Sequence, residues 1–466
     1  MADKEKEHNA PVGAPDEGIE KFGYKQELKR ALGLWDLVIY GLVWAVPIAP
    51  FVVYGYVVET AKGMVALVYL VTVIGVMFTA NSYAKLSAEF PLAGSAYAYT
   101  SRGINNFIGF LIGWLLVLVY LLVPPLMYVF SALALSAILP GVHMFVWITI
   151  FVILVTLVNY LGIELTMKVN KWVLVGQMIV LVWFLAACIL AVAKGSAGAG
   201  FTMRPFYDGA EFGFGVIMAA VSIAVLNFVG TDAITTLAEE TRGGSKTIGI
   251  GMLLAVATLG FLFVVQTYVA SVVWPDYTTF ENADVCFYQI AELVGGGALK
   301  WAVTLAVVIA IGLACSICAQ GSNARIFYGM SRDDMLPKIL SRVHPKYRTP
   351  YLSTIIIGVI SIIVSFAFAE QAATLTSLVN FGALLAFSFV NIAAVIYFMV
   401  RKKSKDYWAH LICPIIGLLV VGYAWISLTS DAMVLGFVWL GLGLLYTVYL
   451  KLVKKVKIGF SSDIGV

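Results

Sequence analysis

A carboxylate stands in the middle of a long apolar stretch of this chain. Residues 213–238 are mostly hydrophobic, but the run is interrupted at residues 227–233, which include Gly230 and Asp232. An ionisable side chain at the centre of a membrane-spanning helix costs roughly 2.5–3.5 kcal/mol on insertion scales, so it usually faces a cavity, a partner or a substrate. Asp232 is therefore a candidate to bind a substrate ammonium group through a charge-assisted hydrogen bond.

A second apolar stretch is also interrupted. Residues 34–57 contain Pro47 and Pro50, which lack backbone N–H groups and cannot continue a regular helix. Two broken spans at corresponding places in two halves of a chain are typical of secondary transporters, whose substrate site lies between the breaks. The sequence thus predicts a transport site near the middle of a membrane.

The elements that carry these breaks are predicted to be membrane helices. Hydrophobic residues make up 61% of the chain and charged residues 12%, against about 25% charged in soluble domains. Apolar runs long enough to cross a bilayer predict an all-α integral membrane protein with twelve transmembrane helices. They lie at residues 34–57, 64–84, 104–139, 144–163, 171–193, 213–238, 247–274, 299–330, 351–369, 374–400, 408–429 and 432–453.

The distribution of basic residues predicts the orientation. With the amino terminus in the cytoplasm, all but four of the 30 Lys and Arg residues fall on the inner side, as the positive-inside rule requires. The four exceptions are Lys62, Lys194, Arg204 and Lys300. We expect a multi-pass protein of the plasma (inner) membrane with both termini cytoplasmic. Its basic loops would contact the lipid bilayer and not nucleic acid.

Other chemistries lack the residues they need. Cys315 and Cys318 have the spacing of a metal or redox pair, but no His or second cysteine pair is near them. No phosphate-binding G-x-x-x-x-G-K-[ST] motif is present. Asp36 and Asp431 are near helix ends, so Asp232 has no second buried aspartate with which to share a proton. The sequence predicts no enzyme, no metal and no cofactor, and the lack of a signalling domain argues against a sensor. Of the cysteines, Cys286 alone is predicted to be reachable from outside.

Several separated motifs resemble those of the amino acid/polyamine/organocation permeases. They are GLVWAVP at residues 41–47, EFPLAGSAY at 89–97, FVGTDA at 228–233 followed by AEET at 238–241, and YGMSRD at 328–333 followed by LP at 336–337. The resemblance covers about residues 28–453 and implies a LeuT-like core of two inverted five-helix repeats, with helices one and six unwound around the substrate. On this basis we divide the chain into a disordered cytoplasmic tail (1–24), a transport core (25–403), helices 11 and 12 (404–456) and a second tail (457–466).

Within this family the sequence looks most like bacterial putrescine importers. HPK at residues 344–346, TP at 349–350 and NFGAL at 380–384 also agree with them. Those importers carry additional acidic residues in the first and third helices, where this chain has Val52 and Val119. A diamine's second ammonium would then lack a carboxylate partner.

The candidate substrate-binding residues lie at the two breaks and on the third helix. Each also has a structural alternative: Asp232 can cap the second half of helix six, and Tyr40 and Trp44 can be packing residues instead of aromatic faces for a cation. Glu239 and Glu240 are predicted to be charges of a cytoplasmic gate. The candidate substrate-binding set is Tyr40, Trp44, Val46, Pro47, Ala49, Tyr120, Asn227, Phe228, Gly230 and Asp232.

The first break also bears on the substrate class. Amino acid permeases of this family have Gly-Ser-Gly there, whose amide groups can hold a carboxylate as helix N-termini hold anions. Here Pro47 and Pro50 remove two of those donors, so the site suits a small organic amine or polyamine, with an amino acid as the alternative substrate. The sequence selects neither proton nor sodium as coupling ion, and it indicates no oligomeric state.

Overall fold

The computed structural model is built almost entirely of helices. It describes residues 30–452 except 93, 94, 139, 140, 199, 281, 282, 284, 285, 333–335, 370, 371 and 429. The predicted tails, residues 1–24 and 457–466, lie outside the described residues. Within the described ranges the one strand-like pairing is an isolated parallel bridge between Leu32 and Thr241.

Most of the α-helices follow the apolar runs of the sequence, and short 3-10 or π-helical segments join or interrupt them. The α-helices are α1 (Leu34–Ala45), α2 (Pro50–Thr60), α3 (Val65–Glu89), α4 (Ala96–Gly103), α5 (Asn106–Ile138), α6 (Met144–Leu161), α7 (Ile163–Ala193), α8 (Phe214–Ala224), α9 (Ser245–Val273), α10 (Cys286–Ile309), α11 (Ser316–Arg332), α12 (Tyr351–Ala367), α13 (Ala372–Val395), α14 (Cys413–Ile426) and α15 (Ser430–Leu452). The 3-10 segments are η2 (Val225–Phe228), η3 (Thr231–Glu240), η4 (Tyr277–Thr279) and η6 (Lys338–Ser341), and the π-helical ones are η5 (Ala310–Cys315), η7 (Ile396–Arg401) and η8 (Trp408–Ile412).

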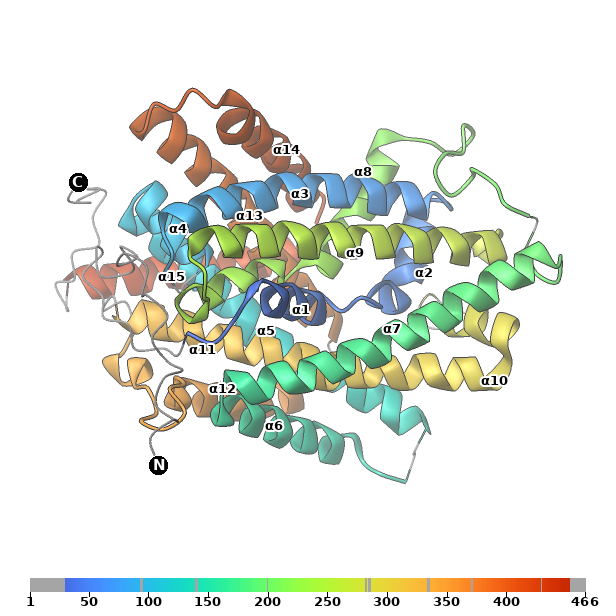
Figure 1. Cartoon of the computed structure of the whole chain (residues 1–466), viewed down its shortest axis with the longest axis horizontal. Coiled ribbons are helices and arrows are strands. Elements are labelled where there is room, and N and C mark those ends of the chain that lie inside the picture. The colour runs from blue at the N-terminus through green and yellow to red at the C-terminus, as the bar shows by residue number, and fades with distance from the viewer. Residues whose placement is uncertain are drawn as a thin grey trace, which may run out of the picture.

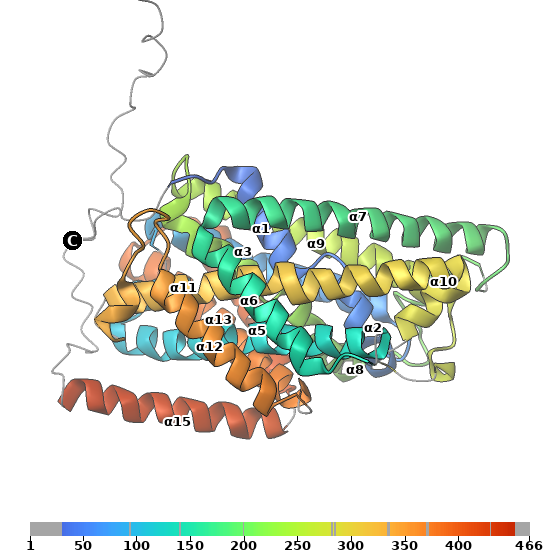
Figure 2. The same ribbon diagram turned by 90° about the horizontal axis from the view of Figure 1, so that it is seen from below.

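The helices form an elongated bundle whose long members run side by side (Figure 1). α3 packs along α9, α13 packs against α5 and α14, and α1 contacts α9 and η3. Figure 2 shows α15 along one edge of the bundle and α7 along the opposite edge. The short segments α1, η2 and η3 thus lie among longer helices.

Apolar side chains cover the outer surface as well as the core. Ile179, Val182 and Leu190 on α7 and Leu445 on α15 are exposed, although they are hydrophobic. In water such a surface would be a liability, whereas in a bilayer it is the expected lipid-facing surface of a helix bundle. The fold is therefore that of an integral membrane protein.

The number of spans agrees with the prediction only in part. Among the described residues, ten helices are long and apolar enough to cross a membrane, or eleven if the bent pair α1 and α2 is one span. α12 matches the ninth predicted span but is a shorter apolar helix of 17 residues. The count of twelve stays a prediction.

One expectation about cysteine accessibility is wrong. Cys286 was placed in an outer loop, but it is the first residue of α10 and is only 1% exposed. Its thiol contacts the carbonyl oxygen of Ala283, 3.4 Å away. A helix already begins here, so the thiol packs inward and a bulky reagent does not reach it.

Candidate functional site

The first break separates α1 from α2. α1 ends at Ala45, α2 begins at Pro50, and the two helices are bent by 57°. Val46 takes a positive φ of 56°, unusual for a β-branched residue. Because Pro47 and Pro50 offer no N–H, carbonyl oxygens around this break need donors from elsewhere.

Other helices satisfy some of these carbonyl oxygens. The side-chain amide of Gln266 on α9 donates to the Pro47 carbonyl at 3.0 Å, and the Cys315 thiol of η5 donates to the Trp44 carbonyl at 3.1 Å. Irregular backbone at membrane depth is tolerated where protein groups replace the lost helical hydrogen bonds. The break is thus a stable feature of the fold.

The second break lies between α8 and η3. After the short segment η2, Val229 is extended and Gly230 has a φ of 95°, in the left-handed region. A Cβ atom at Gly230 would overlap the indole ring of Trp44, so glycine is required here both for conformation and for space. This contact brings the two breaks together.

Asp232 lies immediately beyond the second break. Its side chain is 1% exposed, and one carboxylate oxygen accepts hydrogen bonds from the Tyr120 hydroxyl at 2.5 Å and the Ser95 hydroxyl at 3.1 Å. Among the described residues no Lys, Arg or His forms an ion pair with it. The carboxylate is therefore buried with neutral donors and without a counter-charge.

The alternative role of Asp232 as a helix cap finds limited support. Gly230 is the N-cap residue of η3, so Asp232 occupies the second position of the helix. A negative charge in this first turn still suits the positive end of the helix. The hydroxyl donors of Tyr120 and Ser95 nevertheless come from α5 and from the residue preceding α4, so the carboxylate also links separate elements.

Ser95 was missed as a site residue by the sequence reasoning. It lies just before α4, which runs back alongside the beginning of α5, since Ser101 lies beside Gly109 and Tyr97 beside Gly113. This direction carries Ser95 to the level of Tyr120. Ser95 has a positive φ of 49°, which strains a residue other than glycine. Its motif was visible in the sequence, but nothing local indicated that the chain turns back there.

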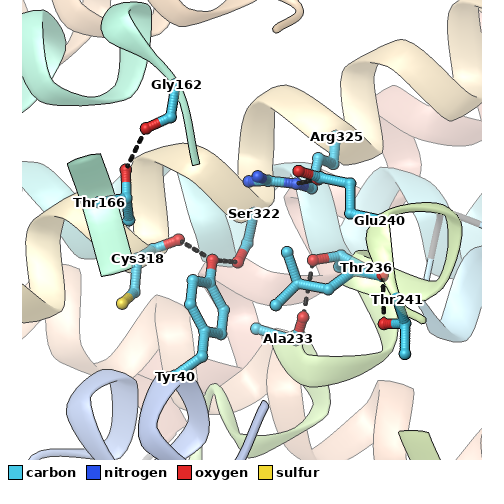
Figure 3. A network of polar contacts seen from close by, with 11 residues as sticks. Tyr40, Gly162, Thr166, Ala233, Thr236, Glu240, Thr241, Cys318, Ser322 and Arg325 are labelled. Carbon is cyan, nitrogen blue, oxygen red and sulfur yellow. Dashed lines mark hydrogen bonds and ion pairs between the residues drawn. The ribbon is translucent and has the colours of Figure 1, made fainter. Parts of the chain in front are cut away.

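The aromatic candidates divide into two groups. Trp44 packs edge-on against Tyr120 with ring centroids 5.7 Å apart, so both rings belong to the Asp232 site. Phe228 instead packs against Phe263 of α9. The Tyr40 hydroxyl is 2.9 Å from both the Cys318 carbonyl and the Ser322 hydroxyl of α11, as Figure 3 shows.

The remaining candidates have structural contacts. The side-chain amide of Asn227 donates to the Tyr69 hydroxyl at 2.7 Å. The Val46 carbonyl accepts a hydrogen bond from the Ala49 amide at 2.8 Å, which closes a turn within the first break. These residues shape the two breaks, and no hydrogen bond joins them to Asp232.

Glu239 and Glu240, at the far end of η3, are paired with arginines of α11. Glu239 forms a two-pronged pair with Arg332, with distances of 2.8 and 3.1 Å, and Glu240 pairs with Arg325 (Figure 3). The backbone carbonyl of Glu240 also accepts from the amides of Ala31 and Leu32. This end of η3 is thereby tied to both α11 and the segment before α1.

The described part of the chain contains no cluster of side chains suited to bind a metal ion. No group of three or more His, Cys, Asp or Glu side chains converges there, and all five cysteines are free. Cys318, the second cysteine of the pair that has the spacing of a metal site, accepts a hydrogen bond from the Asn170 side-chain amide at 3.1 Å. Both members of that pair are thus engaged in helix packing.

Comparison with known proteins yields a family match over almost the whole chain. The amino acid permease family profile matches residues 36–454. The low-affinity putrescine importer PlaP of Escherichia coli (strain K12) is 32% identical over 90% of this chain and 93% of its own.

Two Bacillus subtilis (strain 168) proteins are similar at lower identity. The branched-chain amino acid permease BcaP is 26% identical over 91% of this chain and 94% of its own. The methylthioribose transporter is 24% identical over 91% of this chain and 93% of its own. The relatives thus share a transport role and differ in what their names say they carry.

Proposed function

This chain belongs to the amino acid permease family, and on that premise we propose that it takes up a small organic amine by alternating access. Membrane transport itself follows from the family and from the apolar helix bundle. The substrate and the way it is recognised are the proposal. We further propose the LeuT-like arrangement of two inverted repeats in residues 25–403, with the breaks at helices one and six framing the substrate.

The observation that carries the proposal is the state of Asp232. A buried carboxylate that accepts hydrogen bonds from neutral donors, with no basic partner, lacks its electrostatic complement, and burying an unpaired charge is costly. An ammonium group placed against it would supply that complement through a charge-assisted hydrogen bond. The first break also lacks the amide donors that residues other than proline would have at positions 47 and 50, so it has less capacity to hold a carboxylate.

Binding measurements on the purified protein test this proposal. Thermal stabilisation should be compared for two pairs, isoamylamine with leucine and putrescine with ornithine, since a ligand that binds the folded state raises the melting temperature. We expect the amine of at least one pair to stabilise the protein no less than its parent amino acid, and isoamyl alcohol, an uncharged control, to have no effect. Stabilisation by the amino acids alone would overturn the amine assignment.

The second candidate function is an amino acid permease. The similarity to BcaP over nearly the full length of both chains favours it. Under this function the substrate's carboxylate would need donors at the first break, where the two prolines provide none. The pair series above separates the two functions directly, because the members of each pair differ only in the carboxylate.

We also propose that the end of the bundle with most of the Lys and Arg residues faces the cytoplasm. All native cysteines are buried, so single cysteines can be introduced at exposed positions without removing them. Lys194→Cys should react with an impermeant thiol reagent on intact cells, and Lys405→Cys should react only after the cells are opened. The reverse pattern would invert the orientation, with the unmodified protein as the background control.

A further inference from the structure

Among the described side chains, one buried carboxyl group has no basic partner. The buried carboxylates there are Asp232, Glu239 and Glu240, each no more than 3% exposed. Glu239 is paired with Arg332 and Glu240 with Arg325, so these four groups balance one another. Asp232 alone remains, and a ligand of charge +1 would neutralise it.

This balance distinguishes the classes of ligand that carry an ammonium group. A zwitterionic amino acid adds no net charge and leaves the site at −1, whereas a diamine adds two charges and leaves it at +1. Charge left over in a low-dielectric interior is strongly unfavourable. Val119, beside Tyr120 on α5, is buried and faces Gly382 of α13, so this neighbourhood supplies no second carboxylate.

Trp44 adds a second, independent feature. Its side chain is 3% exposed, and its indole N–H donates to no atom of the described residues. This N–H is therefore free to donate a hydrogen bond to a ligand atom. The indole atoms closest to Gly230 are Cε3, Cζ3 and Cδ2, which places the N–H on the opposite edge of the ring, away from the helix break.

The ring of Trp44 packs beside the residues that hold Asp232. Trp44 contacts both Tyr120, whose hydroxyl donates to Asp232, and Gly230, which lies two residues before Asp232. We propose that the substrate has a single cationic centre, bound by Asp232, and a neutral hydrogen-bond acceptor, bound by the Trp44 N–H, as in an amino alcohol. This inference rests on the proposed function, in which Asp232 binds an amine.

A series of matched ligands tests the inference on the wild-type protein. 4-Amino-1-butanol, pentylamine, putrescine and β-alanine are the same size, but they differ in net charge and in the group at the far end. We expect 4-amino-1-butanol to bind tightest. Pentylamine should bind about 2-fold to 10-fold more weakly because it lacks the acceptor. Putrescine and β-alanine should bind at least about 10-fold more weakly because they leave a buried charge.

A substitution then tests whether the Trp44 N–H binds the acceptor group of the ligand. Trp44→Phe keeps an aromatic ring but removes the N–H, so 4-amino-1-butanol should lose its advantage over pentylamine. Trp425→Phe is the matched control, because its indole N–H is also unpaired but lies on α14, against Phe381 and Phe437. That variant should retain the advantage. Persistence of the advantage in Trp44→Phe would overturn the role of the N–H.

The outcomes separate this inference from the proposed function. If putrescine binds as tightly as 4-amino-1-butanol or more tightly, the single-charge inference fails while amine binding stands. If β-alanine and leucine bind and none of the three amines does, the proposed function fails with it. Should Trp44→Phe not fold, the order of the four ligands on the wild-type protein still decides the charge argument.

Discussion

The two ends of η3 hold carboxylates in opposite ways. At its beginning, Asp232 accepts hydrogen bonds from Tyr120 and Ser95, which are neutral. At its end, Glu239 and Glu240 each pair with an arginine of α11. Ten residues of one helix thus contain a carboxylate without a counter-charge and two with one.

This difference suggests separate roles for the carboxylates, with Asp232 binding the substrate and the two glutamates holding helices together. A charge that the protein balances itself has no need of a ligand, so the arginine pairs hold elements together, and their role in a gate stays a proposal. A charge that has neutral donors alone is stabilised only partly, and a cationic ligand would supply the missing stabilisation. The comparison predicts that changes at the end of η3 affect mainly stability and that changes at its beginning affect mainly binding.

The largest expected effect comes from breaking the Glu240 pair. Arg325→Met leaves Glu240 buried without a partner, which should lower the free energy of unfolding by about 3–5 kcal/mol. The double variant Glu240→Leu/Arg325→Met removes both charges and should recover most of that loss. Denaturant unfolding in detergent measures both. Equal losses in the single and double variants would contradict a balanced pair.

Arg332→Met tests whether the loss of stability depends on how deeply the ion pair is buried. The Arg332 side chain is 16% exposed, compared with 6% for Arg325, so solvent screens its loss more effectively. Its variant should be destabilised less than Arg325→Met. A larger loss at Arg332 would show that burial does not set the strength of these pairs.

A smaller effect is expected at the beginning of η3. Tyr120→Phe removes a hydroxyl that donates to the Asp232 carboxylate at 2.5 Å. Hydrogen bonds to charged groups are worth about 1.5–3 kcal/mol, so the unliganded protein should lose stability in that range. Melting curves should show a larger upward shift on adding isoamylamine to this variant than to wild type, because the ammonium replaces part of the lost interaction. An unchanged melting temperature without ligand would rule out a contribution from this hydrogen bond.

The smallest effect is expected at Ser95, where a lost hydrogen bond and backbone strain can be separated. Ser95→Ala loses the 3.1 Å hydrogen bond but keeps a Cβ at positive φ, and should cost about 0.5–1.5 kcal/mol of stability. Ser95→Gly loses the same bond but relieves the strain, so it should be the more stable of the two. If Ser95→Gly were the less stable variant, strain at this residue would be negligible.

Much of the fold follows from local sequence. Apolar runs predicted the helices, and Pro47 and Gly230 predicted the places where helices break, because these residues act through their own backbone. Cys286 was wrongly placed in a loop because the residues around it are not apolar enough to indicate a helix, although α10 already begins there. The residues that meet Asp232 depend instead on how α4 and α5 pack.

The two ion pairs between η3 and α11 illustrate what local sequence cannot indicate. Glu240 and Arg325 are 85 residues apart, and Glu239 and Arg332 are 93 apart. The glutamates were predicted to be gate charges, but their partners depend on η3 packing against α11, which no periodicity reveals. Ser95 was missed for the same reason, since its bond to Asp232 spans 137 residues.

The most direct test compares Asp232→Asn with Glu240→Gln in the same preparation, measuring both isoamylamine affinity and unfolding. Asn has nearly the volume of Asp and keeps an oxygen that can accept from the Tyr120 and Ser95 hydroxyls, so Asp232→Asn should remain folded. Loss of its charged hydrogen bond should weaken amine binding by about 10-fold to 150-fold. Glu240→Gln should lose stability far more than affinity. Unchanged isoamylamine affinity in folded Asp232→Asn protein would contradict the assignment of Asp232 as the ammonium-binding group.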